Sequence, residues 1–164
     1  MDTITFQELY EAHARDVHRF ARYLCGTDDA AADVTSETFL RAWVGRESIR
    51  GGTARAYLLA IARNLCRDRR RRARRWQEGA MPERAVRPDA EARVELDRTL
   101  DAVRALPERY REPLLLIASG VSYEEAGRVL ALPVSTVKIR VHRARLELAA
   151  ATPPAVGDHH AALR

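Results

Sequence analysis

The sequence predicts an all-α fold, with two small helical domains joined by a flexible linker. Apolar residues recur at three- and four-residue intervals, and no stretch alternates cleanly enough to form a strand. This periodicity stops over residues 76–94, which contain two prolines and a glycine. A chain of 164 residues suits one ordinary domain or two small ones. We therefore predict a domain over 1–75, a linker over 76–97, a second domain over 98–150 and a disordered tail over 151–164.

Three helices are expected in the first domain. The apolar positions of the first helix are Leu9, Ala12, Val17, Phe20, Ala21 and Leu24. Residues 26–29 (GTDD) supply a turn with helix-capping residues before the second helix, over residues 30–43. A third helix begins near Thr53 and has one apolar face, formed by Tyr57, Leu58, Ile61 and Leu65. Another face of that helix is basic and carries Arg63, Arg67, Arg70 and Arg74.

The second domain has the pattern of a helix-turn-helix. A helix can begin at Pro107, and Pro113 in the same apolar segment should kink or shorten it. After Gly120, the segment Ser122 to Glu125 forms a capping box that opens a second helix. Residues 131–133 (ALP) then make a short turn before a last helix over residues 134–148.

The net charge of +5 is the sum of unlike parts. Residues 1–54 carry a net −3, whereas residues 55–75 hold nine arginines and a single acid and reach +8. Such a concentrated block of guanidinium groups suits phosphate binding, although a solvated polybasic helix end is the alternative. Asn64 lies at the boundary between the apolar and basic faces of this helix and is able to hydrogen-bond an unpaired base edge. For the nearby aromatics Trp43 and Tyr57, core packing is favoured over base stacking.

The last helix has the composition of a DNA-reading element. One side is apolar (Val134, Val137, Val141, Ala144 and Leu148), so this side should pack against the preceding helices. The other side exposes an isoleucine among basic and hydroxyl groups, which suits thymine methyl and guanine contacts in a major groove. The residues concerned are Ser135, Thr136, Lys138, Ile139, Arg140, His142 and Arg143. A basic surface helix in a small bundle remains the alternative from this segment alone.

Several classes of protein and site are not indicated. No apolar run is long enough to span a membrane, and the N-terminus carries acids where a signal peptide would be basic, so we expect a cytoplasmic protein with no membrane insertion. Cys25 and Cys66 lie 41 residues apart without metal-ligand spacing, and we expect two reduced thiols. Asp33 and Glu37 share a helix face but lack a third ligand, so a docking patch or a solvated pair is favoured over a metal site. We expect no catalytic residue, metal or cofactor.

Three segments in this order resemble the extracytoplasmic-function (ECF) group of bacterial RNA polymerase sigma factors. The first is residues 33–43 (DVTSETFLRAW), and the second is residues 56–65 (AYLLAIARNL) with the arginines that follow. The third comprises residues 106–111 (LPERYR), the capping box, and residues 133–145 up to Arg143-Ala144-Arg145. Together they cover about residues 5–149. The resemblance implies a second domain of the winged-helix-like, sigma region 4 type.

The resemblance also implies roles for individual residues. Core RNA polymerase would be bound by Asp33, Glu37, Phe39 and Trp43. The minus-ten element, with its melted non-template strand, would be engaged by Arg63, Asn64, Arg67 and Arg71. The seven residues of the last helix named above would read the minus-thirty-five element in duplex promoter DNA, and family habit implies an anti-sigma factor as a further partner.

Some positions depart from the family pattern, and two rival functions stay open. A glycine-containing turn is usual where this chain has Ala131, which suggests a different turn because a non-glycine residue in the left-handed region costs about 1 kcal/mol. A free-standing helix-turn-helix regulator would use the second domain but leaves the first unexplained. A nuclease or recombinase would need clustered carboxylates or an activated serine, and the acids here are dispersed.

Overall fold

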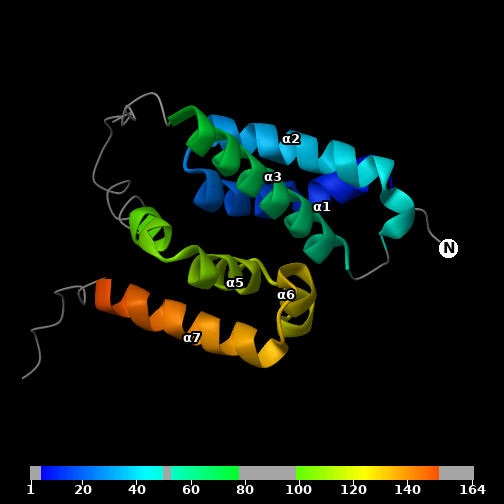
Figure 1. The fold of residues 1–164 in the computed structure, drawn as a ribbon. Coiled ribbons are helices and arrows are strands. Elements are labelled where there is room, and N and C mark those ends of the chain that lie inside the picture. The colour runs from blue at the N-terminus through cyan, green and yellow to red at the C-terminus, as the bar shows by residue number, and fades with distance from the viewer. Residues whose placement is uncertain (1–4, 50–52, 78–98, 152–164) are drawn as a thin grey trace, which may run out of the picture.

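The computed structural model describes residues 5–49, 53–77 and 99–151, and every regular element in these ranges is a helix. Helices α1 to α3 pack together, and α5 to α7 form a second group beneath them (Figure 1). The predicted all-α class is confirmed. Most of the predicted linker and nearly all of the predicted tail lie outside the described residues. Within this part of the chain, no helix is both long and apolar enough to cross a membrane.

The first two helices are defined by their caps. Helix α1 (Phe6–Cys25) begins with a capping box between Thr5 and Glu8 and ends at Gly26, whose φ of 93° lies in the left-handed region that favours glycine. Thr27 then accepts a hydrogen bond from the backbone of Ala30 and caps α2 (Asp28–Val44). The predicted turn is therefore present. Ala12, expected on the buried face of α1, is exposed.

Helix α3 (Ala54–Gln77) packs against both α1 and α2, and the short 3-10 helix η1 (Arg46–Ser48) precedes it. Leu58, Leu59 and Ala62 are fully buried beside Phe20 and Phe39 of the other two helices. Helix α3 runs two residues beyond the predicted domain end at residue 75. The buried apolar stripe of α3 ends at Cys66, and the helix continues through the exposed arginines to Gln77.

The second group begins with helical residues 99–105, followed by α5 (Glu108–Ala118), for which Pro107 is the N-cap. Pro113 lies inside α5 and is buried, yet the helix continues to Ala118. The expected shortening at Pro113 is therefore wrong. Burial of the proline ring with Leu115 and Leu116 in the core compensates for the missing backbone donor.

Helices α6 (Tyr123–Leu130) and α7 (Val134–Ala151) complete the helix-turn-helix. The predicted capping box at Ser122 and Glu125 is formed, with backbone-to-side-chain distances of 3.0 and 3.2 Å. Ala131 ends α6 with φ 54° and ψ 47°, in the left-handed region. The expectation that alanine would change the turn is wrong, because Ala131 adopts the conformation that usually favours glycine.

The two groups of helices share a contact. Helix α3 touches α6, α1 touches α5, and one cluster of buried apolar residues continues through both groups. Polar contacts add to it: the guanidinium of Arg104 donates to the carbonyl of Gly26 at 2.8 Å. The arrangement places α5 beside the basic face of α3.

Candidate nucleic-acid interface

Helix α7 presents the predicted base-reading face to solvent. Val137, Val141 and Ala144 are buried on its other side, which packs against α5 and α6. The exposed members of the predicted set are Ser135, Lys138, Ile139, His142 and Arg143, whereas Thr136 and Arg140 are half-buried. The side chain of Ile139 is 62% exposed, which is unusual for a large apolar residue outside an interface.

The single lysine of the chain lies at the edge of this face. The Lys138 ammonium lies 5.7 Å from the ring centroid of Tyr123 on α6, within cation–π range. This contact links the start of α7 to the first turn of α6. It holds the Lys138 amine close to the N-terminal end of α6.

Three of the four predicted minus-ten residues lie on α3 along a basic groove. Asn64, Arg67 and Arg71 are exposed and line the groove together with arginines on both sides of them. Arg71 pairs with Asp68 one turn earlier at 2.8 Å. Glu108 of α5 closes one wall of the same groove. The groove therefore joins the two groups of helices.

Ion pairs between α3 and α5 engage part of the basic face. Arg63 Nε donates to Glu112 Oε2 at 2.8 Å, and Arg70 Nη1 donates to Glu108 Oε2 at 2.9 Å. Arg67 Nε lies 3.4 Å from the other oxygen of Glu108. Helix α5 therefore covers the side chain of Arg63 in this arrangement, and the predicted contact of Arg63 with the minus-ten element stays a prediction.

On α2, the predicted polymerase contacts divide into surface and core. Asp33 and Glu37 share one face, where Asp33 lies 3.5 Å from Arg69 of α3 and Glu37 accepts from Arg41 at 2.6 Å. Phe39 is buried at 1% exposure, and its ring packs against that of Tyr10 at a tilt of 56°. The ring of Phe39 is therefore covered in this structure, and its predicted contact with core polymerase stays a prediction. It supports the surface from below.

Comparison with known proteins assigns both groups of helices. The family model described as Sigma-70 region 2 matches residues 9–76, and that described as Sigma-70, region 4 matches residues 96–148. The ECF RNA polymerase sigma factor EcfG of Rhodopseudomonas palustris is 39% identical over 80% of this chain and 76% of its own length. The chain belongs to the ECF RNA polymerase sigma factors.

Other relatives agree with this assignment. The ECF sigma factor SigC of Mycobacterium tuberculosis is 40% identical over 88% of this chain and 81% of its own. Among solved structures, the sigma factor RpoE in complex with the anti-sigma factor NepR from Bartonella quintana superposes with a TM-score of 0.75 at 30% identity, covering 89% of this chain and 95% of that one. CnrH, solved with the cytosolic domain of CnrY, gives 0.68 at 32% identity, covering 88% and 85%.

This ECF sigma factor directs promoter-specific transcription, and the alternative of a free-standing helix-turn-helix regulator is not favoured. That alternative left the first group of helices unexplained, whereas the region 2 match spans all three of them. The recognition of the family from sequence is confirmed.

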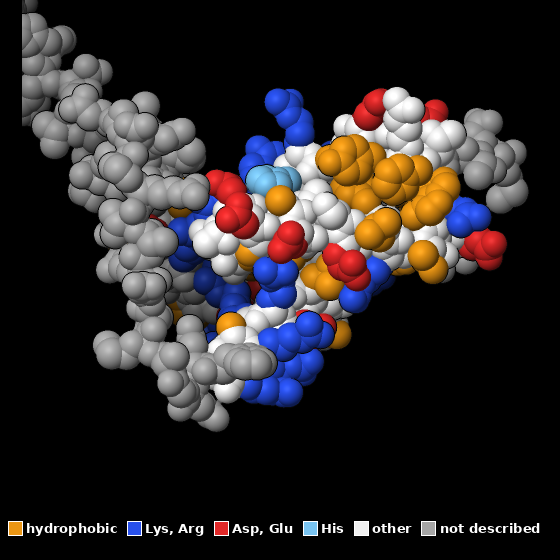
Figure 2. All heavy atoms as spheres, turned by 90° about the horizontal axis from the view of Figure 1, so that it is seen from above, with side chains coloured by type: hydrophobic (Ala, Val, Ile, Leu, Met, Phe, Trp, Pro, Cys, Tyr) orange, Lys and Arg blue, Asp and Glu red, His pale blue; other side chains and the backbone are white. Residues whose placement is uncertain are grey.

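The sigma factor also carries an exposed apolar patch that the sequence reasoning missed. It comprises Leu40 and Val44 of α2, at 60% and 84% exposure, with Phe6 and Tyr10 of α1. Figure 2 shows hydrophobic side chains gathered at one side of the face that it draws. The signal was available: Leu40 and Val44 are four residues apart and lie outside the buried stripe of α2. Trp43 extends the patch, because its ring packs edge-on against Phe6 at 5.5 Å.

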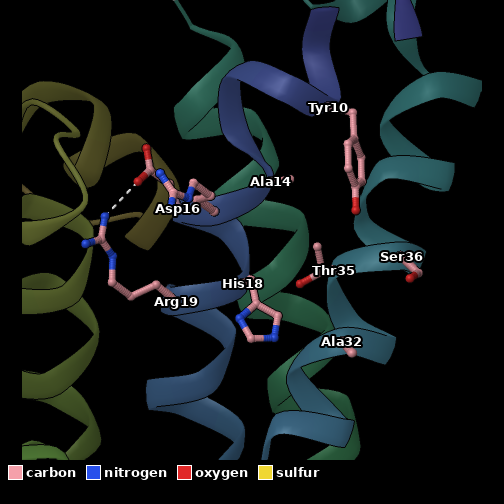
Figure 3. Close-up of a pocket in the computed structure, with 9 residues that line it drawn as sticks. Tyr10, Ala14, Asp16, His18, Arg19, Ala32, Thr35 and Ser36 are labelled. Carbon is pink, nitrogen blue, oxygen red and sulfur yellow. Dashed lines mark hydrogen bonds and ion pairs between the residues drawn. The ribbon is translucent and has the colours of Figure 1, made fainter. Parts of the chain in front are cut away.

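A shallow hollow lies between α1 and α2 of the sigma factor (Figure 3). His18 points into it from α1, and Thr35 and Ser36 line it from α2. Asp16, also at its edge, is paired with Arg19 at 2.8 Å. Across the described ranges, no three His, Cys, Asp or Glu side chains gather in a way that could hold a metal ion.

Proposed function

We propose that this sigma factor recognises both promoter elements, with α3 engaging the minus-ten region and α7 reading the minus-thirty-five region. The observation that carries the proposal is the exposure of two separate basic faces, each backed by buried apolar residues. Asn64, Arg67 and Arg71 form the first face, and Lys138 and Arg143 belong to the second.

On α3, recognition would combine phosphate binding with base capture. Asn64 is exposed between arginines, where its amide can pair with the edge of a flipped base while guanidinium groups bind the adjoining phosphates. Unstacking a base costs a few kcal/mol, which such contacts must offset. Arg63 would join this set only after its ion pair with Glu112 opens.

On α7, recognition would be direct readout in the major groove. Lys138 or Arg143 can donate to guanine O6 and N7, and Ile139 can contact a thymine methyl. Ser135, Thr136, Arg140 and His142 would complete the contacts to bases and phosphates. The buried side of α7 would keep the helix in place during binding.

Binding to core polymerase would use α2. Asp33 and Glu37 supply its charged surface, and Trp43, Leu40 and Val44 supply the neighbouring apolar surface. A surface with exposed apolar residues and a charged border is typical of a protein–protein interface. Phe39 would hold this surface in shape from the core.

The compact arrangement of the two helix groups would be the unbound state. Glu108 and Glu112 occupy the arginines that promoter phosphates would otherwise bind, so DNA and α5 compete for the same groups. Each group of helices binds weakly alone, and polymerase raises the effective concentration of the second group once the first is bound. An anti-sigma factor, as in the solved complexes of the relatives, would stabilise an unbound state. The protein would act in the cytoplasm without catalytic activity or a cofactor.

In vitro transcription with core polymerase on a promoter library tests the proposal. We expect run-off product only when the full chain is added, and selected promoters should share both a minus-ten and a minus-thirty-five sequence. The purified chain alone should give no footprint on the same promoters. A footprint without polymerase, together with unchanged transcription, would support a free-standing regulator instead.

A further inference from the structure

The chain has two cysteines, and the fold brings them together although they lie 41 residues apart. Cys25 is the last residue of α1, and Cys66 lies in the middle of α3. Their Sγ atoms are 2.6 Å apart, closer than two sulfurs that are merely packed together. A disulfide has a bond of about 2.05 Å, so a movement of about half an ångström would bring them to bonding distance.

The two thiols differ in their surroundings. Cys25 is half-buried, whereas Cys66 is 3% exposed in the core. Arg70 donates to the carbonyl of Leu24 at 3.2 Å, which places its guanidinium next to Cys25. An oxidant in solution therefore reaches Cys25 first, and Cys66 is shielded beneath it.

The electrostatic environment also makes Cys25 the more reactive of the two thiols. The hydrogen bond from the Cys66 thiol lowers the pKa of Cys25 against the opposing effect of burial, and the charges of Arg69 and Arg70 lower it further. The hydrogen bond with Cys25, burial and the charge of Cys25 all raise the pKa of Cys66. Thiolate character, which determines reactivity, thus belongs to the more accessible sulfur.

We propose that Cys25 and Cys66 form a peroxide-oxidised, reversible disulfide site that links α1 to α3. The Cys25 thiolate attacks hydrogen peroxide: an S–O bond forms, the O–O bond breaks, and the departing hydroxide takes up a proton to become water. The Cys66 sulfur, giving up its proton, then attacks the resulting sulfenic acid. The S–S bond forms, the S–O bond breaks, and a second water leaves, so that two thiols and one peroxide give one disulfide and two waters. A dithiol reductant reverses the linkage by exchange.

The linkage would fasten the helix that carries the proposed minus-ten face. Cys66 lies between Asn64 and Arg67 on the chain but points into the core, while those two side chains are exposed. The disulfide would therefore leave the face uncovered and join α3 covalently to α1 beneath it. Closing a loop of this length constrains the unfolded chain, and we expect the midpoint of thermal unfolding to rise by about 10 °C.

Peptide mapping of the full chain after peroxide treatment tests the proposal. The protein is treated while folded, quenched, denatured and alkylated with N-ethylmaleimide. We expect loss of alkylation at both cysteines, a mass lower by two hydrogens, and one cross-linked peptide pair containing Cys25 and Cys66. Dithiothreitol should restore both alkylation sites and the original melting midpoint.

Two variants separate the roles of the thiols. Cys66→Ser should leave Cys25 as a sulfenic acid that dimedone traps, whereas Cys25→Ser should leave Cys66 alkylatable after the same treatment. Should either variant fail to fold, the mapping of the wild-type chain decides alone. Retained alkylation at both cysteines, over-oxidation of Cys25 without a cross-link, or disulfides only between two chains would each overturn the proposal.

Discussion

Arg63 of α3 and Glu112 of α5 form an ion pair between the two groups of helices, with Nε and Oε2 2.8 Å apart. Their side chains are only 12% and 7% exposed, so water screens the pair little. The carboxylate neutralises an arginine of the proposed minus-ten face and also fixes α5 against it. The same ion pair therefore holds the two groups of helices together and occupies an arginine that the proposal assigns to DNA binding.

Glu112→Gln should loosen the contact between the two groups. The amide retains an acceptor but no charge, and we expect the free energy of unfolding to fall by about 2 kcal/mol because a buried guanidinium loses its counter-charge. The radius of gyration should rise as α5 leaves α3. Chemical denaturation and small-angle X-ray scattering measure the two effects.

Glu108→Gln is the matched control for this variant. Glu108 also lies on α5 and pairs with Arg70 and Arg67 of α3, but its side chain is 39% exposed. Removing its charge should therefore lower the free energy of unfolding by less than about 1 kcal/mol. Equal losses of stability in the two variants, or an unchanged radius of gyration for Glu112→Gln, would contradict a special role for the buried pair.

Ala131→Gly should stabilise the helix-turn-helix. The alanine is exposed and holds φ at 54°, so removing its Cβ relieves left-handed strain without loss of packing. The greater freedom of glycine in the unfolded chain offsets part of the gain, which leaves about 0.5 to 1 kcal/mol. Denaturant midpoints measure it. Ala12→Gly, at an exposed position inside α1, should instead cost about 0.5 to 1 kcal/mol, and a loss at both positions would show that the turn is not strained.

Local patterns predicted the elements of this fold because their causes are local. The capping box at Ser122 and the glycine at position 26 act within a few residues, so both are visible in the sequence. The apolar stripe of α7 likewise predicted which side is buried. Pro113 misled because the sequence shows the cost of a missing donor but not the packing of the ring in the core.

What the sequence did not indicate depends on contacts between distant segments. The partners of Arg63 and Cys25 lie 49 and 41 residues away, and no periodicity relates such positions. Resemblance placed Phe39 in a binding segment, but only the packing of α1 on α2 shows that its ring is covered. Only the tertiary structure shows which residues of segment 33–43 are exposed and which are buried.

His13 should make the folded protein less stable in mild acid. Burial lowers its pKa and the charge of Arg55 lowers it further, whereas Asp16 opposes the shift. Glu125 of α6 lines a second small hollow together with His13 and Arg55. The unfolded chain, with a histidine pKa near 6.5, then binds more protons than the folded chain. The free energy of unfolding should therefore fall as the pH drops below about 6.5.

The dependence can be checked by denaturation at a series of pH values between neutrality and mild acid. His13→Gln should flatten the slope in that window. His142→Gln, on the exposed face of α7, serves as the control and should leave the slope as it is. Parallel slopes for wild type and His13→Gln would assign the acid sensitivity to other groups.

Glu37→Arg should weaken binding to core polymerase. The change reverses a charge on the proposed docking surface and also places two arginines four residues apart on α2, which costs the helix only about 0.5 kcal/mol. A tenfold or larger rise in the dissociation constant, about 1.4 kcal/mol, is expected from fluorescence titration without DNA. Glu147→Arg makes the same change in net charge on α7. If both variants bind as the wild type does, the proposed role of Glu37 is rejected.

Asn64→Ala and Lys138→Ala should impair different steps of initiation. Asn64 is placed to capture an unpaired base, so its loss should slow open-complex formation by about tenfold on any duplex promoter. Lys138 lies on the duplex-reading helix, so its loss should matter only where a minus-thirty-five element is present. A fluorescent opening assay on matched templates, with and without that element, separates the two, and Arg15→Ala on the exposed surface of α1 controls for the loss of a charge. If Asn64→Ala and Lys138→Ala slow promoter opening equally on both templates, then α3 and α7 do not divide melting and duplex recognition between them.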